Sequence, residues 1–516
     1  LDILDIFLLA KEMFSDLLII ILTEWKLFFI FTIIVLIYYS HLNTFNFFKK
    51  KNVKFLEPKF LIGNLGPRLA LKTSIHEFNK DIYDQFKGYP FGGFFEGQNP
   101  VLMVLDQDLI KNILIRDSTH FIDRLTLPSK EPSYVKRNLL NLKGEEWKSV
   151  RSSLTPTFSS ARLRAMIPLL EYCSDQLVQL MKGKDVEMKH ILGHFTLDVI
   201  GACAFGIKCD VLSNKNSNFL TVAEKFNYIP TWKRTLFLFL LITMPSLMKY
   251  ITFSFFNPDT AEELLKILTN NKKERRTGQT NDFLQLMIDA SETEQKSVNI
   301  IIKYVIDLDD PTIDAQSLLF LLAGYETSST LLSFAVHVLA TQTHIQDMLR
   351  AHIDEHVNGD ITYEVLSKMN YLESFLLETL RIYPPVARID RECTKIYTIP
   401  NSNVIVNVGD VVGISVYGVH MDPDIYPEPN IFRPERFSEE ERKDRPAHMY
   451  LAFGGGPRNC IGLRFALISA KLAIISLVQN FRFTPCSQTM DPVKFNKKSQ
   501  LLKPESGLWV HVEAIK

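Results

Sequence analysis

The sequence contains few cysteines, and none of them is part of a Cys-x-x-Cys pair. Six cysteines are spread over 516 residues. A structural zinc site needs closely spaced cysteines and a disulfide framework needs many, so we expect neither of them. A single cysteine is most often a small buried hydrophobe, and each of the six is interpreted in this way unless its neighbours indicate otherwise.

An excess of charge of either sign is also absent. Lysine plus arginine equals aspartate plus glutamate at 58 each, so the formal net charge is zero. A nucleic-acid partner would favour a basic excess, and we expect no such partner. The chain also lacks a glycine-rich fingerprint for a flavin or a nicotinamide. Any redox chemistry in this protein would therefore require electrons from another protein.

One long apolar run lies near the N-terminus. Residues 27–39 read LFFIFTIIVLIYY, and their flanks extend the span to 25–42, close to the roughly 17 to 25 residues that a bilayer requires. The lysines after the run favour a cytosolic position for the rest of the chain. We expect an extension over 1–24, a single-pass transmembrane signal anchor over 25–42 and a linker over 43–66. A cleaved signal peptide and a buried core helix are the alternatives.

The pattern of apolar residues and prolines changes after Tyr383. Before it, apolar residues recur with helical period; after it, prolines separate the strand-like pieces VIVNV and VVGISV, and a final apolar helix follows Gly462. We therefore expect a mainly α fold with a smaller β element, in one large domain over 67–516. The expected helices cover 147–182, 186–206, 260–290, 312–341 and 364–382.

The segment 453–462 gives one cysteine an unusual setting. It reads FGGGPRNCIG and places Cys460 just before a helix, where free backbone N–H groups stabilise a thiolate. The glycines let the backbone approach a flat ring closely. Arg458 can pair with a carboxylate on that ring, and Phe453 can keep water from the sulfur. The segment therefore predicts a thiolate metal ligand against a planar cofactor.

This loop resembles the Phe-x-x-Gly-x-Arg-x-Cys-x-Gly loop of the cytochrome P450 family. The resemblance runs from about residue 55 to 510 and is greatest to animal microsomal members of the drug- and xenobiotic-metabolising clade. The stretches LTPTFSSARLRAM, NDFLQLMIDA and AGYETSS carry that finer assignment. The resemblance implies a haem-thiolate domain that binds haem b (iron protoporphyrin IX), with Cys460 as the axial ligand of the iron.

A helical Glu-x-x-Arg motif precedes the loop in the order typical of the family. Taken alone, Glu378 and Arg381 would be an ordinary pair of neighbours on a helix surface. The resemblance implies instead that they form a buried salt-bridged triad with Arg436. Its role would be structural, because it would hold the segment that carries the cysteine loop.

The helix expected over 312–341 contains Gly324, Glu326 and Thr327, and we expect Asp310 to be its N-cap. A glycine inside a helix costs about 1 kcal/mol relative to alanine, which invites a reason. The resemblance implies that the helix opens at Gly324 above the cofactor, that Thr327 hydrogen-bonds to dioxygen, and that Glu326 relays protons. The alternative is that Thr327 bonds back to the carbonyl of Ala323 and that Glu326 is solvated.

Three further residues are implied to contact a haem propionate. Trp147 and Arg151 lie one helical turn apart on one face, and Arg388 follows the Glu-x-x-Arg helix. Arg124 is an additional candidate. Each of these cations could instead be an ordinary surface residue.

The resemblance implies a monooxygenase that inserts one oxygen atom from O2 into a lipophilic small-molecule substrate. Electrons would come from NADPH through NADPH–cytochrome P450 reductase, with cytochrome b5 as an optional second partner. Lys148, Arg162 and Arg164 are candidates for a basic docking patch. The protein would lie in the endoplasmic reticulum membrane with its catalytic domain in the cytosol. The alternatives are a peroxide-rearranging haem isomerase of the same fold and a non-catalytic haem or lipid binder.

Two segments depart from simple expectations. The apolar run over 235–251 is too short and broken to span a bilayer, so it either dips into the membrane beside a substrate entrance or belongs to the core. Residues 297–308 are more apolar than the loop expected there, and they are predicted to be an additional helical turn or an insertion.

Overall fold

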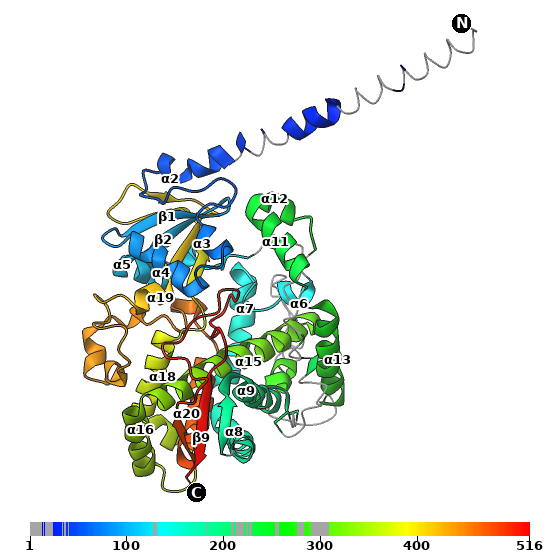
Figure 1. Ribbon diagram of the computed structural model, residues 1–516. Helices are drawn as coiled ribbons and strands as arrows, with labels where there is room; N and C mark the ends of the chain where they lie inside the picture. The colour runs from blue at the N-terminus through cyan, green and yellow to red at the C-terminus, as the bar shows by residue number, and fades with distance from the viewer. Residues whose placement is uncertain are drawn as a thin grey trace, which may run out of the picture.

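The computed structural model describes residues 13, 15, 24–32, 35, 38–39, 41–126, 132–181, 183–207, 211–212, 221–222, 225, 230–252, 257–275, 283–289 and 309–515. These residues form a mainly helical body with three small sheets (Figure 1), which confirms the expected fold class. Most of the expected extension over 1–24, and all of segment 297–308, lie outside the described residues.

Helix α15 (Asp310–Thr341) crosses the centre of the body (Figure 1). It packs against α9 (Met188–Phe205), α18 (Asn370–Ile382) and α20 (Leu463–Asn480). Its N-cap is Asp309, one residue earlier than predicted, and the Asp309 carboxylate accepts from the Thr312 N–H at 3.0 Å. Among the described residues, α15 and α20 are the helices long and apolar enough to cross a membrane. Since 56% of each apolar window is buried inside the body, we assign both helices to the core.

Two of the predicted helices are interrupted. The one expected over 147–182 is α7 (Gly144–Leu154), a 3-10 turn (Thr155–Phe158) with Pro156 in its first turn, and α8 (Ser160–Leu180). The one expected over 364–382 is split at Met369 into α17 (Tyr363–Lys368) and α18. The other helices are α2 (Phe47–Lys50), α3 (Gly66–Leu69), α4 (Ile75–Gln85), α5 (Gln107–Lys111), α6 (Ser133–Lys136), α11 (Thr231–Thr243), α12 (Pro245–Met248), α13 (Pro258–Arg275), α16 (Thr343–His356) and α19 (Val416–His420).

The largest sheet has the strand order β1-β2-β7-β4. It consists of β1 (Phe91–Glu96), β2 (Asn99–Val104), β7 (Val411–Ser415) and β4 (Arg388–Glu392). β4 pairs antiparallel with β7, so that alternate side chains of β4 point to opposite faces of the sheet. A second sheet has the strand order β3 (Lys184–Glu187), β9 (Trp509–Ala514), β8 (Phe481–Thr484). A third sheet pairs β5 (Tyr397–Thr398) with β6 (Ile405–Val406).

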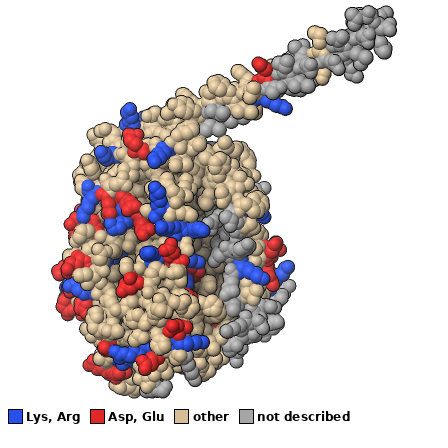
Figure 2. Space-filling model, in the orientation of Figure 1, with Lys and Arg blue, Asp and Glu red and all other residues tan. Residues whose placement is uncertain are grey.

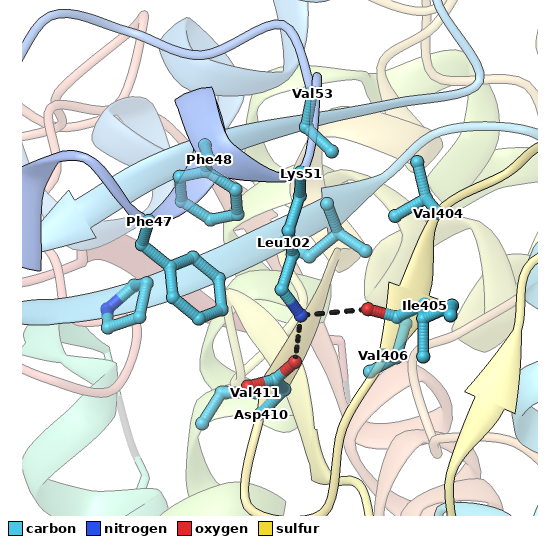
Figure 3. A pocket seen from close by; sticks show the side chains of 11 residues that line it. Phe47, Phe48, Lys51, Val53, Leu102, Val404, Ile405, Val406, Asp410 and Val411 are labelled. Carbon is cyan, nitrogen blue, oxygen red and sulfur yellow. Dashed lines mark hydrogen bonds and ion pairs between the residues drawn. The ribbon is translucent and has the colours of Figure 1, made fainter.

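The segment predicted as a linker is part of the folded body. Phe48 is 1% exposed and packs edge-on against Phe95 of β1, and Phe55 forms a bridge to the same strand. The Lys51 ammonium pairs with Asp410 at 2.6 Å and donates to the Ile405 carbonyl at 2.8 Å (Figure 3). The body therefore begins near Phe47 rather than at residue 67, because phenylalanines next to these lysines pack against the sheet.

A helical segment projects from the end of the body that carries the large sheet (Figure 1). Its described stretch, residues 24–32, is helical, and most of its large apolar side chains are exposed, such as Trp25 at 70%. Part of the span 25–42 lies outside the described residues, so the transmembrane anchor stays a prediction.

Candidate cofactor site

The loop before α20 is closed by its own backbone. The Cys460 N–H donates to the Phe453 carbonyl at 2.8 Å, so this hydrogen bond joins the two ends of the loop. Gly456 has a φ of +67°, and a Cβ at this position would overlap the carbonyl oxygen of Leu114. Glycine is therefore required here both by backbone conformation and by close packing against a neighbouring turn.

We infer that Cys460 borders a hollow inside the protein. Its residue surface is exposed, yet burial is the main influence on the pKa of its thiol and raises it. A group surrounded by protein that still has free surface borders an interior space rather than open solvent. Ala323 has the same character, because it is exposed in the middle of α15, a helix whose residues are mostly buried or half-buried.

Two arginines hold the loop beside the sulfur. Arg151 donates from Nη1 to the Asn459 carbonyl and from Nη2 to its side-chain oxygen, both at 3.0 Å. Arg124 donates to the Arg458 carbonyl at 3.0 Å. Both guanidinium groups, together with a backbone hydrogen bond from Gly462, lower the pKa of Cys460 against the effect of burial. The arrangement therefore favours the thiolate over what burial alone would allow.

Arg458 is built into the wall of the site. Its guanidinium lies 4.1 Å from the centre of the Trp147 ring and donates to the carbonyls of Ile122 and Leu142, each at 2.7 Å. Trp147 is 4% exposed and Arg458 is 3% exposed. Trp147, Arg151 and Arg458 are thus brought together beside the cysteine loop.

Buried positive charge exceeds negative charge at this place. Arg391 and Arg458 each have a pKa lowered to about 9, first by burial and then by the charge of Arg124. Among the described residues, Asp123 is the one carboxylate that forms an ion pair with these arginines or Arg151, at 3.3 Å from Arg458. The Nε of Arg124 is buried and has no hydrogen-bond partner. This surplus fits an anionic group such as a pair of carboxylates.

Arg391 belongs to this group of arginines, although the sequence motifs did not single it out. The structure does not bring Arg388 to this group: its guanidinium pairs with Glu96 at 2.8 Å and Asp390 at 2.7 Å and lies over the Phe94 ring. Burial acts to lower the pKa of Arg388, but the two carboxylates outweigh it and raise the pKa. Arg388 and Arg391 are three positions apart on β4, so they point to opposite faces. This alternation was the signal that could have found Arg391.

Gly324 is placed against α9 and not at an opening of α15. A Cβ here would overlap Ile200 of α9, so the glycine permits a close crossing of the two helices. α15 is continuous through this position. The prediction that the helix opens at Gly324 is therefore not met, and the reason for the glycine is packing.

Thr327 and Glu326 lie in different surroundings. The Thr327 hydroxyl donates to the Ala323 carbonyl at 2.6 Å, which is the alternative that the sequence left open. Glu326 is 8% exposed and pairs with Lys503 at 3.0 Å and Lys189 at 3.5 Å, so it is not simply solvated. Burial acts to raise the pKa of Glu326, but the two ammonium groups outweigh it and the pKa is lowered.

The predicted salt-bridged triad is confirmed. Arg381 pairs with Glu378 at 2.7 Å, and Arg436 lies 3.4 Å from the same carboxylate. None of the three side chains is more than 2% exposed. Arg381 also donates to the carbonyls of His420 and Pro429, each at 2.8 Å, and so fixes the irregular segment that leads to the cysteine loop.

These features define a cofactor-binding protein of mainly α fold in which a cysteine sulfur faces an interior hollow beside buried arginines. A family model for Cytochrome P450 matches residues 54–511. Similar proteins are Cytochrome P450 9e2 of Blattella germanica (36% identical, over 95% of this chain and 98% of that protein), Cytochrome P450 6a8 of Drosophila melanogaster (34%, 93% and 97%) and Cytochrome P450 3A5 of Homo sapiens (34%, 93% and 95%).

The chain belongs to the cytochrome P450 family, and it is a cytochrome P450 monooxygenase. The family implies a haem cofactor, and the residues present fit one. Cys460 offers a sulfur ligand. The surplus of buried guanidinium groups offers partners for the carboxylates of the haem edge.

Proposed function

We propose that this chain binds haem b with Cys460 as the axial ligand and inserts one oxygen atom from O2 into a lipophilic substrate. Electrons come from NADPH through NADPH–cytochrome P450 reductase, with cytochrome b5 as a second donor. The observation that carries the proposal is the Cys460 sulfur, which borders an interior hollow and has Arg124 and Arg151 as electrostatic partners. When bound, the haem supplies dioxygen activation, which a thiolate ligand favours.

The propionates are assigned to the buried arginine group. Arg124, Arg151 and Arg391 lack carboxylate partners among the described residues, and Trp147 closes the wall behind Arg458. Phe453 lies half-buried at the start of the loop, where it limits the access of water to the sulfur. These residues would hold the carboxylates of a bound haem next to the cysteine loop.

Proton delivery is assigned to Glu326 and Thr327. Glu326 contacts Lys503, whose side chain is 41% exposed and provides a connection to solvent. Thr327 is the next residue on α15, and a rotation of its hydroxyl away from the Ala323 carbonyl would free it to donate into the hollow. These groups therefore hold and pass protons, and they do not bind the cofactor.

The membrane assignment is supported by exposed apolar side chains on α11 and after α12. Trp232 is 65% exposed, Phe239 56% and Tyr250 73%. α11 and α12 lie at the end of the body from which the N-terminal helix projects (Figure 1), and the surface around them carries few charges on the face in Figure 2. We infer that this end rests on the endoplasmic reticulum membrane, with an anchor over 25–42 and the body in the cytosol.

Two of the basic residues proposed to bind the reductase have carboxylate partners within the chain. Lys148 pairs with Glu145 at 2.6 Å, and Arg164 pairs with Glu364 at 2.9 Å and lies over the Tyr363 ring. Lys148 and Arg164 are both exposed, so an acidic partner could compete for them. We retain Lys148, Arg162 and Arg164 as the proposed docking patch.

The test is turnover of the full haem-loaded chain with reductase, NADPH and a panel of lipophilic compounds. We expect oxygenated product only when both NADPH and reductase are present. Product formed from peroxides without reductase would instead indicate the isomerase, and binding without turnover would indicate a carrier. Thr327→Ala is expected to consume NADPH with less product and more peroxide, whereas Ser328→Ala, the matched control, stays coupled.

A further inference from the structure

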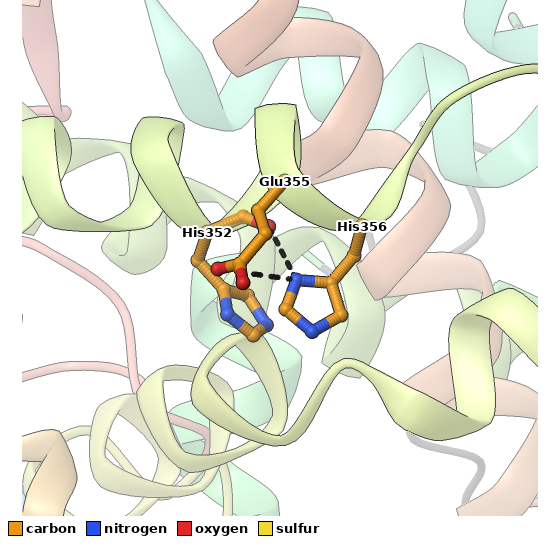
Figure 4. A group of neighbouring side chains, drawn as sticks. All are labelled: His352, Glu355 and His356. Atoms are coloured by element: carbon orange, nitrogen blue, oxygen red, sulfur yellow. Dashed lines mark hydrogen bonds and ion pairs between the residues drawn. The ribbon is translucent and has the colours of Figure 1, made fainter.

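The last turn of α16 gathers three side chains that can bind a metal ion. His352, Glu355 and His356 each offer one ligand atom, and these atoms lie within 4.8 Å of one another. The spacing explains the arrangement, because positions i, i+3 and i+4 share one face of a helix. Figure 4 shows the carboxylate and the two rings turned toward the same side of the helix.

The two histidines have nitrogen lone pairs available. His356 Nδ1 lies 2.9 Å from the His352 carbonyl oxygen, which can only accept, so Nδ1 carries the proton and Nε2 carries the lone pair. This backbone contact is the kind that orients metal-binding histidines. The Nε2 atom of His352 is buried and has no hydrogen-bond partner, a state that calls for a reason.

Two members of the cluster are also accessible. The side chain of Glu355 is 76% exposed and that of His356 is 33% exposed, so both can adjust around an incoming ion. The two ring centroids are 4.2 Å apart, and a small rotation of His356 would open the space between them. The position at the C-terminal end of α16 adds the negative end of the helix dipole, which favours a cation.

We propose that the C-terminal turn of α16 is a Zn²⁺ site formed by His352, Glu355 and His356. Two imidazoles and one carboxylate are ligands that zinc prefers, and a fourth position stays open for water. The site is separate from the cysteine loop. Because α16 packs against α18 and α20, we expect zinc bound here to stabilise the last turn of α16 in its place against these two helices.

The experiment titrates Zn²⁺ into the untagged, haem-loaded full chain against a chromophoric chelator. We expect one equivalent to bind with micromolar affinity and to raise the thermal unfolding temperature. His352→Ala and His356→Ala are each expected to weaken binding at least about tenfold. His344→Ala is the matched control, because His344 is exposed near the first residue of the same helix, and it should bind zinc like the unchanged chain.

A second readout separates ligand loss from misfolding. The carbon-monoxide spectrum of each variant should equal that of the unchanged chain, since no residue of the cluster belongs to the cysteine loop or to the arginines that hold it. Equal zinc affinity in all four proteins would place the metal elsewhere and overturn the proposal. Failure of the unchanged chain to bind zinc below millimolar concentration would overturn it as well.

Discussion

At the scale of single residues, the chemistry of Cys460 results from two opposing influences. Burial raises the pKa of the thiol, whereas Arg151 and Arg124 lower it. The same arginines hold the carbonyls of Asn459 and Arg458, so they position the loop and polarise the sulfur together. The cation that a thiolate needs is therefore part of the scaffold that points it into the hollow.

The two β4 arginines give a prediction that separates cofactor binding from folding. Arg391→Gln removes a buried cation that lacks an ion-pair carboxylate among the described residues, and we expect haem loss to a scavenging protein to become about tenfold faster. Arg388→Gln leaves Glu96 and Asp390 without their cation, so we expect it to lower the free energy of unfolding instead. Faster haem loss in Arg388→Gln than in Arg391→Gln would contradict the assignment.

The site residues that could be predicted from the sequence are those whose neighbours lie close to them in the chain. Arg458 and Phe453 lie in the cysteine loop itself, and Trp147 and Arg151 share a helix face, so motif spacing was enough to propose them. Arg388 and Arg391 could not be ranked without the strand, because β4 directs them to opposite faces. The partner of each arginine comes from a segment distant in the chain, which no local pattern indicates.

At the scale of elements, the crossing of α9 and α15 depends on Gly324. We expect Gly324→Ala to lower the free energy of unfolding by about 1 to 3 kcal/mol, because its Cβ would overlap Ile200. Ile200→Ala in the same chain should recover part of the loss by making room. If the double variant is no more stable than the sum of the two single changes predicts, Gly324 does not act through this contact.

The triad gives a second prediction at this scale. Glu378→Gln removes the carboxylate shared by Arg381 and Arg436 and leaves two buried cations, at a cost of about 3 to 5 kcal/mol. Urea unfolding of the haem-loaded chain measures the loss. Glu373→Gln serves as a control on the same helix, because its partner Lys471 keeps a second contact, a 2.8 Å bond to the Leu366 carbonyl. A loss no larger than that of the control would contradict a structural role for the triad.

Element boundaries were predicted less well than element types. The periodic apolar segments identified the long helices, since apolar residues at helical spacing indicate a helix with one buried face. The helices break near Pro156 and at Met369, whereas the apolar pattern continued through both positions. The segment over 43–66, predicted as a linker, packs on the body through Phe48, whose contact with Phe95 of β1 is not visible in the local sequence.

At the scale of the whole molecule, buried neutral histidines predict sensitivity to acid. Burial lowers the pKa of His76 and His337 to about 4, and burial with Arg381 lowers that of His420 to about 3. His420 Nδ1 lies 3.1 Å from the Arg381 carbonyl, and its Nε2 accepts from the Leu451 N–H at 2.9 Å. Protonation of Nε2 would therefore break a link to the segment just before the cysteine loop.

The direction of this pH dependence is set by the unfolded state, in which the pKa of these histidines is near 6.5. Between about pH 6.5 and 4 the unfolded chain binds protons that the folded chain does not, so stability falls as the pH falls. We expect up to about 1.4 kcal/mol per pH unit for each histidine. Urea unfolding across this range should show a shallower slope in His420→Gln, and an unchanged slope would exclude His420 as a contributor.

The most direct test of the central assignment is the carbon-monoxide difference spectrum of the reduced, purified full chain. A thiolate from Cys460 predicts a main band strongly shifted to the red, and Cys460→Ser should lose that band or the haem itself. A folded protein whose band lies at the shorter wavelength typical of histidine ligation would contradict Cys460 as the axial ligand, and so would an unchanged spectrum in Cys460→Ser.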